Sequence, residues 1–235
     1  MTIPEILEQL NEWGEASYKR ILMNHGAVEP VLGVKISELK KIQKQVKQDY
    51  QLALELFETG IYDAQYLSGL IADDARMTKK DLNHWLAKSN SPAISSSVVS
   101  WVAAESPHGM ELALKWITSK KEMNAQAGWT TLSCLVALKK DDELDLEKIK
   151  ALLQQIEQTI HQQHGLVRYS MNTFVISVGC YISSLTADAM KTAKKIGTVT
   201  ADMGNTACKV PEAVEYIEKV KKRGAIGKKR KTVKC

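Results

Sequence analysis

The chain has 235 residues, of which 44% are hydrophobic and 25% are charged, and its formal net charge is +5. A chain of this length can bury roughly 70% of the surface that it exposes when unfolded, so it needs no disulfide to fold. The four cysteines, Cys134, Cys180, Cys208 and Cys235, include no CxxC pair. This pattern favours reduced thiols in the cytosol over a disulfide-stapled secreted domain.

The sequence also argues against membrane and metal sites. The N-terminal stretch MTIPEILEQLNEW is acidic and amphipathic, unlike a signal or transit peptide, and no apolar run is long enough to cross a bilayer. His161 and His164 have no obvious third ligand, so we expect no metal. Nothing resembles a P-loop, a dinucleotide fingerprint or a metalloprotease motif, and we expect no cofactor. We therefore expect a cytoplasmic protein without a membrane partner.

Apolar residues at helical spacing predict an all-α chain. The first helix begins near Leu7 and runs to about Asn24, where His25 and Gly26 end it. Ser37 is expected to cap the second helix, and Thr78 a later helix that carries Trp85. Further helices are predicted at residues 52–57, 66–75, 125–138, 144–163, 166–183, 187–196 and 211–222. The 144–163 helix is amphipathic, with one apolar face formed by Leu146, Ile149, Leu152, Leu153, Ile156 and Ile160. No stretch predicts a hairpin.

Two Ser-Pro dipeptides mark two more helix starts. Ser91–Pro92 and Ser106–Pro107 each place a capping hydroxyl before a proline, which fits the first helical position. Trp101 and Trp116 each follow their proline by nine residues, so the two helices repeat one design. The run Ser95–Ser97 lies inside the first of them, as a small face for helix packing or for close approach of a ligand.

The spacing of four tryptophans favours a solenoid of stacked helix pairs. Residues 85, 101, 116 and 129 are separated by sixteen, fifteen and thirteen positions. Such spacing fits pairs of roughly 30 residues, somewhat shorter than the repeats of HEAT proteins. An irregular helical bundle is the alternative. The stretch GTVTADMGNTACKVP, residues 197–211, is the one long loop, and loops of this length are often functional.

The basic character of the chain belongs to its last fifteen residues. The segment KKRGAIGKKRKTVKC contains eight Lys or Arg and no acidic residue, so the preceding residues are net acidic. We expect a helical domain over residues 1–222 and a basic tail over 223–235. Such a cluster binds phosphates with strongly salt-dependent, sequence-independent affinity. A solvated tail without a dedicated ligand is the alternative.

Three stretches of the chain resemble one known family. They are YKRILMNHGAVEPVLGVKISELKKI (18–42), WLAKSNSPAISSSVVSW (85–101) and KWITSKKEMNAQAGWTTLSCLVALK (115–139). The resemblance is to the AlkD-type DNA alkylation-repair proteins, alkylpurine DNA glycosylases built from HEAT-like repeats, and it covers most of residues 15–185. It implies a right-handed, curved superhelix of antiparallel helix pairs. The concave face of that superhelix cradles duplex DNA without flipping the damaged base.

The same resemblance implies that this chain is a divergent member of the family. Catalysis in the family depends on a Trp and an Asp just after a Lys-Ser dipeptide, an Arg in the next-but-one helix and a second Trp. Lys88–Ser89 matches the dipeptide, and Ser91 and Ser95 then occupy the Trp and Asp positions. Ala127 falls near the Arg, and Thr173 or Phe174 near the last Trp. None of these catalytic residues is carried over.

The missing carboxylate puts base excision in doubt. Breaking the glycosidic bond builds positive charge on the sugar, which a carboxylate stabilises and a serine hydroxyl does not. Ser95 is no better as a nucleophile, because neither His84 nor His108 shows spacing that would pair it with a base. If the catalytic acid has moved, Asp202 and Glu105 are the candidates to inspect, with the pair Asp73–Asp74 as a further alternative.

Candidate nucleic-acid contacts come from four places in the sequence. Ser95 and Ser96 follow a predicted helix start, where free N–H groups favour an anion. Arg168 begins a later helix, and Lys209 lies in the long loop. The tail adds Lys228, Lys229, Arg230 and Lys231. Trp129 is expected to pack in the core rather than stack on a base.

Three functions remain open at this point. We favour a HEAT-like-repeat protein that binds the phosphate backbone of duplex DNA, damaged or intact, without glycosylase chemistry. The first alternative is an N3/N7-alkylpurine glycosylase with a relocated acid. The second is a helical-repeat scaffold for protein partners, which predicts binding that survives loss of residues 221–235. The sequence does not predict the oligomeric state.

Overall fold

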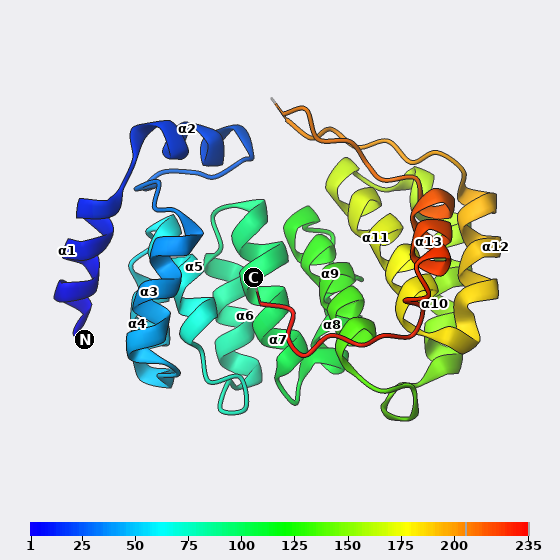
Figure 1. Ribbon diagram of the computed structural model, residues 1–235, viewed down its shortest axis with the longest axis horizontal. Coiled ribbons are helices and arrows are strands. Elements are labelled where there is room, and N and C mark those ends of the chain that lie inside the picture. Colours follow the sequence, from blue (N-terminus) through cyan, green and yellow to red (C-terminus); the bar gives the residue numbers. More distant parts are fainter. Residues whose placement is uncertain (205, 235) are drawn as a thin grey trace. The chain divides into compact units, whose positions relative to one another are not determined.

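The computed structural model describes residues 1–204 and 206–234. Within these residues the chain forms thirteen α-helices and no strand, which confirms the all-α prediction (Figure 1). The chain divides into two compact units: unit 1 holds residues 1–108 with 204, 206 and 234, and unit 2 holds 109–203 with 207–233. The boundaries 1–222 and 223–235 stay a prediction, and Cys235 lies outside the described residues.

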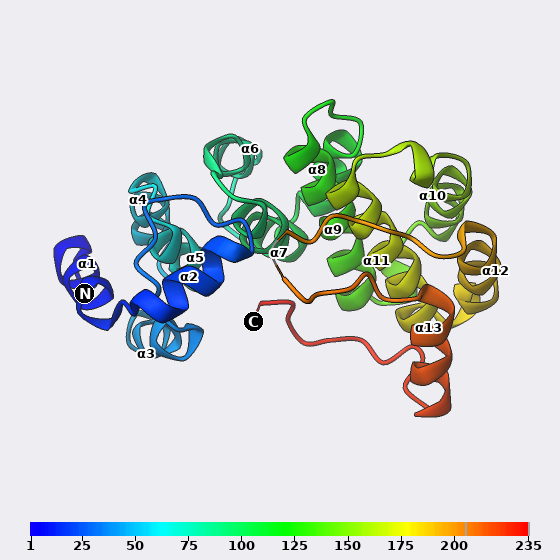
Figure 2. The same cartoon turned by 90° about the horizontal axis from the view of Figure 1, so that it is seen from above.

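Unit 1 is built around one completely buried helix. Its elements are α1 (Ile3–Trp13), α2 (Ala16–Asn24), α3 (Ile36–Val46), α4 (Tyr50–Glu58), α5 (Tyr62–Ile71), α6 (Lys79–Lys88), a π-helical segment (Ile94–Val99) and α7 (Ser100–Glu105). Every residue of α5 is buried, and α5 packs against α3, α4 and the π-helical segment (Figure 2). At the last of these contacts a Cβ on Gly69 would lie 2.5 Å from Val98 Cγ1, so only glycine allows this approach.

Unit 2 has an equivalent central helix. Its elements are α8 (Gly109–Trp116), α9 (Glu122–Leu138), α10 (Leu146–Thr159), α11 (Gly165–Tyr181), α12 (Thr186–Ile196) and α13 (Ala213–Lys222), with 3₁₀ turns at Asp141–Glu143, Ile160–Gln162 and Ser183–Leu185. The α11 helix packs against α9, α12 and α13. Of the six apolar residues predicted to share one face here, Leu146 is partly exposed and the other five are buried: Ile149, Leu152, Leu153, Ile156 and Ile160.

Local capping explains several of these boundaries. Thr78 accepts the Asp81 amide, and the Asp81 carboxylate accepts the Thr78 amide, so the predicted cap of α6 is confirmed as a reciprocal pair. The predicted cap at Ser37 is wrong, because Lys35 precedes α3 and Ser37 lies inside the helix. The predicted single helix to Asn24 is also wrong. It breaks after Trp13, because Gly14 takes an extended conformation with ψ of 130°.

The helix predicted after Ser91–Pro92 is π-helical over Ile94–Val99 before it continues as α7. The Ser91 hydroxyl is buried and has no hydrogen-bond partner among the described residues, so it does not act as the expected cap. The hydroxyls of Ser95 and Ser96 both donate to the Pro92 carbonyl, and Ser100 donates to the Ser95 carbonyl five residues back. Serine hydroxyls thus compete for backbone carbonyls along this segment, which favours a departure from regular α-helix.

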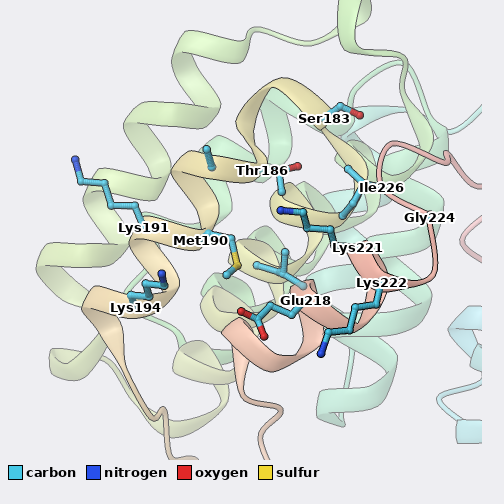
Figure 3. A pocket seen from close by; sticks show the side chains of 12 residues that line it. Ser183, Thr186, Met190, Lys191, Lys194, Glu218, Lys221, Lys222, Gly224 and Ile226 are labelled. Carbon is cyan, nitrogen blue, oxygen red and sulfur yellow. The ribbon is translucent and has the colours of Figure 1, made fainter.

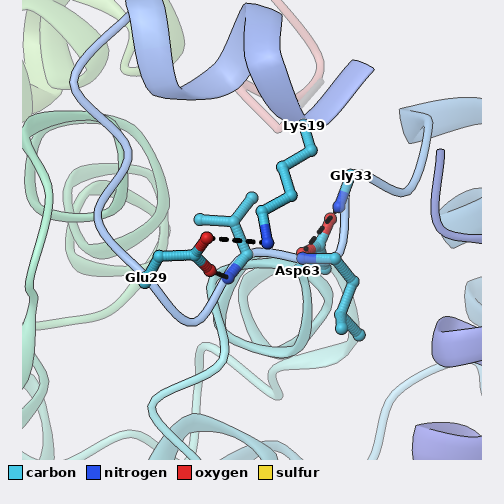
Figure 4. A network of polar contacts seen from close by, with 6 residues as sticks. Lys19, Glu29, Gly33 and Asp63 are labelled. Carbon is cyan, nitrogen blue, oxygen red and sulfur yellow. Dashed lines mark hydrogen bonds and ion pairs between the residues drawn. The ribbon is translucent and has the colours of Figure 1, made fainter. Parts of the chain in front are cut away.

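A buried carboxylate in α5 fixes the loop before α3. Asp63 is 1% exposed and accepts N–H bonds from Leu32 (2.6 Å), Gly33 (3.4 Å) and Val34 (2.7 Å), as Figure 4 shows in part. Gly33 has φ +82°, and a Cβ there would lie 2.5 Å from the Glu15 carbonyl oxygen. The backbone can therefore follow this path only if position 33 is glycine.

The loop in turn holds α2, a helix with no buried side chain. Glu15 donates its amide to the Gly33 carbonyl at 3.1 Å. Lys19 forms an ion pair with Glu29 at 2.7 Å, and Glu29 also accepts the Val31 amide (Figure 4). These two contacts lower the pKa of Glu29, the Lys19 contact most. The α2 helix leaves Ile21 and Met23 exposed, at 51% and 43%.

A second buried charge lies at the end of the described chain. Lys234 Nζ lies 2.7 Å from Asp74 Oδ2, and both side chains are 10% exposed. Burial raises the pKa of Asp74 to about 6, although Lys234 opposes this shift. The negative charge of Glu105 raises it further. Desolvation therefore outweighs the attraction within this ion pair.

No single described helix is both long and apolar enough to cross a bilayer. Gly165–Tyr181 and Ser183–Ile196, bent by 115°, meet the length and composition criteria only as a pair.

We predict that Asp63→Asn destabilises the protein. The amide keeps the size of the carboxylate but places an NH₂ group against backbone donors, and leaving buried donors unsatisfied costs about 2 to 4 kcal/mol here. Urea unfolding followed by circular dichroism measures the loss. Asp142→Asn, at an exposed position, is the matched control and is expected to change the unfolding free energy by less than about 0.5 kcal/mol. Equal stability of the two variants would contradict the role of Asp63.

The Asp74 charge predicts a distinct pH dependence of stability. Its pKa of about 6 in the folded chain exceeds the ordinary 3.8, so between these values the folded state binds more protons than the unfolded state. The contribution of Asp74 to the free energy of unfolding therefore falls as the pH rises from 4 to 6. Chemical unfolding at several pH values gives the free energy of unfolding of the wild type and of Asp74→Asn. The wild-type value minus the variant value is expected to fall over this range.

Asp73→Asn serves as the control for this experiment, since it removes a neighbouring carboxylate and leaves the buried pair intact. Its pH dependence is expected to follow that of the wild type. A wild-type minus Asp74→Asn difference that rises with pH would show that the Lys234 attraction dominates instead.

Candidate nucleic-acid interface

The serine segment contributes one accessible candidate rather than two. Ser95 is completely buried, and its hydroxyl is used by the Pro92 carbonyl. Ser96 is partly exposed, although its hydroxyl donates to the same carbonyl at 2.7 Å. The close contact between Gly69 and Val98 shows that this segment packs tightly against α5. Of the two predicted serine contacts, Ser96 is therefore the one that a phosphate could reach.

The two carboxylates considered as relocated acids lie in different units. Glu105, at the end of α7 in unit 1, is partly buried and lies close enough to Asp74 to raise its pKa. Asp202 is exposed in unit 2. Its loop passes close to Gly165, the first residue of α11, where an added Cβ would lie 3.3 Å from the Asp202 amide nitrogen. Neither carboxylate lines the pocket that lies between α11, α13 and the tail.

The basic tail is bound to unit 2 along residues 227–230. Gly227 donates its amide to the Cys180 carbonyl at 2.8 Å, and Arg230 donates its amide to the Ala137 carbonyl at 2.8 Å. The Lys229 ammonium lies 2.9 Å from both Asp141 Oδ1 and the Val136 carbonyl. Contacts with distant parts of the chain therefore hold this segment in place, and Lys229 is used in holding it.

The neighbouring cations face outward. Arg230 donates from Nε to the Tyr181 hydroxyl at 2.9 Å, and its guanidinium lies 5.9 Å from the centre of that ring. Lys228 and Lys231 are exposed. In the tail, Lys229 therefore serves as an anchor and Arg230 is oriented by a tyrosine. The other two cations, Lys228 and Lys231, remain accessible to a phosphate.

These cations border a pocket of about 430 Å³ between α11, α13 and the tail. Three tyrosines line it, Tyr169 and Tyr181 from α11 and Tyr216 from α13, together with Lys228 and Arg230. We call these five residues the tyrosine pocket. Tyr216 is 48% exposed, so its ring is available at the entrance. Thr173, at the position where the family resemblance places the last catalytic Trp, also lines the pocket.

The residues that line the tyrosine pocket are suited to binding a ligand rather than to cleaving a glycosidic bond. No Asp or Glu is among its lining residues, so no carboxylate is placed to stabilise positive charge on a sugar. Cys180 also lines it, but burial raises the pKa of that thiol to about 11, which keeps it protonated at neutral pH. Aromatic rings for bases and cations for phosphates are the combination used to bind single-stranded nucleic acid.

The other two predicted contacts in unit 2 lie apart from this set. Arg168 is in the first turn of α11 and is partly exposed, with a buried Nε that has no hydrogen-bond partner among the described residues. Lys209 is exposed in the long loop. Trp129 is 2% exposed and lies 5.5 Å from Phe174, ring centre to ring centre, which confirms that it packs in the core.

The described residues contain no group of three or more His, Cys, Asp and Glu side chains that could hold a metal ion. His161 Nε2 lies 2.8 Å from the Ile196 carbonyl oxygen, so this nitrogen donates a hydrogen bond rather than a lone pair.

Sequence patterns did not identify the three tyrosines as a set. Tyr216 is far from Tyr169 and Tyr181 in sequence, and only folding brings α13 beside α11. A weak signal existed in GLVRYSM, where Tyr169 follows the candidate Arg168.

Comparisons with known proteins agree with this structure. A family model described as DNA alkylation repair enzyme matches residues 6–217. Two Listeria proteins, the uncharacterized proteins Lin0241 of L. innocua and Lmo0209 of L. monocytogenes, are each 31% identical over 209 residues, covering 87% of this chain and 90% of theirs.

A solved structure is similar over the full length of both chains, with 34% identity and a TM-score of 0.93. It is described as a new family of proteins related to the HEAT-like repeat DNA glycosylases with affinity for branched DNA structures. The all-helical architecture is therefore that of the HEAT-like repeat glycosylases. From its fold, and from a family match that spans residues 6–217, the chain belongs to the DNA alkylation repair enzyme family.

Proposed function

We propose that this protein binds branched DNA and does not excise bases. The observation that carries the proposal is the tyrosine pocket, which combines three aromatic rings with Lys228 and Arg230 and has no carboxylate. The affinity of the 34%-identical relative for branched DNA supports the same substrate class. Absence of the family's catalytic Trp, Asp and Arg, as the sequence resemblance implies, supports the lack of base excision.

The chemistry of a branch point fits this pocket. Bases inside a duplex are stacked on both faces, and exposing one costs unstacking energy. Bases next to a branch are more easily unstacked, and an exposed tyrosine such as Tyr216 offers them a stacking surface. The outward cations Lys228, Arg230 and Lys231, with Arg168 and Lys209, would contact phosphates on the flanking arms. Lys229 would keep the tail in place.

The first test compares DNA binding with base release. We expect a four-way junction to bind at least 10-fold more tightly than a linear duplex of equal length, in fluorescence anisotropy at fixed salt. In single-turnover assays, excess protein is expected to release no base above the protein-free rate from a duplex with one alkylated purine. Release well above that rate would refute the noncatalytic proposal. Asp202→Asn and Glu105→Gln would then show which carboxylate acts.

Equal affinity for junction and duplex would instead contradict the preference for branches. Binding to neither DNA by folded protein would leave the protein-scaffold alternative.

The exposed tail lysines predict a change in salt dependence. Each phosphate contact that is lost reduces the slope of log affinity against log salt by about 0.9 on duplex arms. Lys228→Gln with Lys231→Gln is therefore expected to weaken junction binding and reduce the slope by about 2. Titrations at several salt concentrations measure it. Lys120→Gln with Lys148→Gln, at exposed positions elsewhere in unit 2, is the matched control, and an equal effect of both pairs would contradict a specific tail contact.

A further inference from the structure

A second and larger concave surface in unit 2 has no role in the proposed DNA binding. It lies between α12 and α13, with a volume of about 1360 Å³ (Figure 3). Four apolar residues line it, Ala187, Met190, Ile217 and Ile226, and we call them its floor. Four lysines also line it, Lys191, Lys194, Lys221 and Lys222, and we call them its rim. We call these eight residues the lysine groove. All of them belong to unit 2.

The rim lysines are not neutralised by ion pairs. Within the described residues, none of the four forms an ion pair with N···O within 4.0 Å, although the charge of Lys191 contributes to lowering the pKa of Glu157. The adjacent Lys195, in contrast, pairs with Glu157, and Lys150 lies 4.0 Å from Asp188. Figure 3 shows Lys194 beside Met190 on α12, and Lys221 and Lys222 on α13, while Lys191 extends outward. Like charges around one groove repel, and a ligand with carboxylates would relieve that repulsion.

The floor distinguishes a protein ligand from DNA. A phosphodiester backbone gains nothing from an apolar floor set between two helices, whereas bulky apolar side chains gain burial there. In addition, Glu218 of α13 lines the groove beside these lysines, and Glu215 is exposed one turn earlier. Both carboxylates would repel a continuous row of phosphates, but a peptide can place a neutral or basic residue opposite them.

We propose that the lysine groove docks an acidic amphipathic helix from a partner protein. Apolar side chains at helical positions i, i+3 or i+4 and i+7 would contact Met190 and Ile226. Flanking Asp and Glu side chains would pair with Lys194, Lys221 and Lys222. This is the groove mode of peptide recognition, in which apolar anchors supply affinity and rim charges supply orientation and specificity. The surface is separate from the tyrosine pocket, so the proposal does not depend on DNA binding.

The test uses a fluorescein-labelled helical peptide with leucines along one face and glutamates beside them. A scrambled peptide of equal composition is the control. Anisotropy with the full chain is expected to show at least 10-fold tighter binding of the ordered peptide. Met190→Glu is expected to reduce that binding at least 10-fold by placing a charge in the floor. Ala187→Glu changes an exposed residue of the same apolar lining, so it gives the same test if Met190→Glu fails to fold.

The rim is tested by Lys194→Glu with Lys221→Glu and Lys222→Glu, expected to reduce peptide binding at least 10-fold. Lys120→Glu with Lys148→Glu is the control and is expected to change it less than 2-fold. Junction binding is measured with the same variants, and Met190→Glu is expected to leave it within 2-fold.

Equal binding of ordered and scrambled peptides, or peptide binding unaffected by floor and rim changes, would overturn the proposal. So would rim changes that abolish junction binding while peptide binding persists, because the groove would then be a nucleic-acid surface.

Discussion

The carboxylate of Asp63 is the interaction on which unit 1 depends. It lies in α5, the one helix of the described residues that is buried along its whole length, and it accepts the amides of three successive loop residues. An isolated buried carboxylate is costly, and here several N–H donors take the place of water. The same bonds fix the loop that holds α2. One charged group thus connects the core helix to a helix that contributes nothing to the core.

Unit 2 uses its central helix differently, since α11 both packs the core and faces solvent. Phe174 lies in the core against Trp129, while Tyr169 and Tyr181 line the pocket. The tail completes this pocket because its backbone binds the carbonyls of Ala137 and Cys180. Affinity for an unstacked base would therefore depend on a segment that is basic by composition but positioned by neutral hydrogen bonds.

Sequence reasoning succeeded where the cause was local. The cap at Thr78 and the apolar face of α10 follow from residues within one or two turns, and both are present. It failed at Ser91, where a buried environment and competing serine hydroxyls override the capping signal. The tail was recognised as basic, but the pairing of Lys229 with Asp141 depends on residues far apart in sequence. The tyrosine pocket and the lysine groove were missed for the same reason.

The exposed helix α2 has a consequence for how this chain can change over evolution. None of its nine residues is buried, and its position is set by the backbone of a loop and by Lys19. Most substitutions on it would cost the core nothing, because surface positions away from special contacts are nearly neutral. Ile21 and Met23 already place apolar surface there. This helix can therefore acquire new contacts while the repeat fold beneath it stays the same, which makes it a natural place for relatives to diverge in specificity.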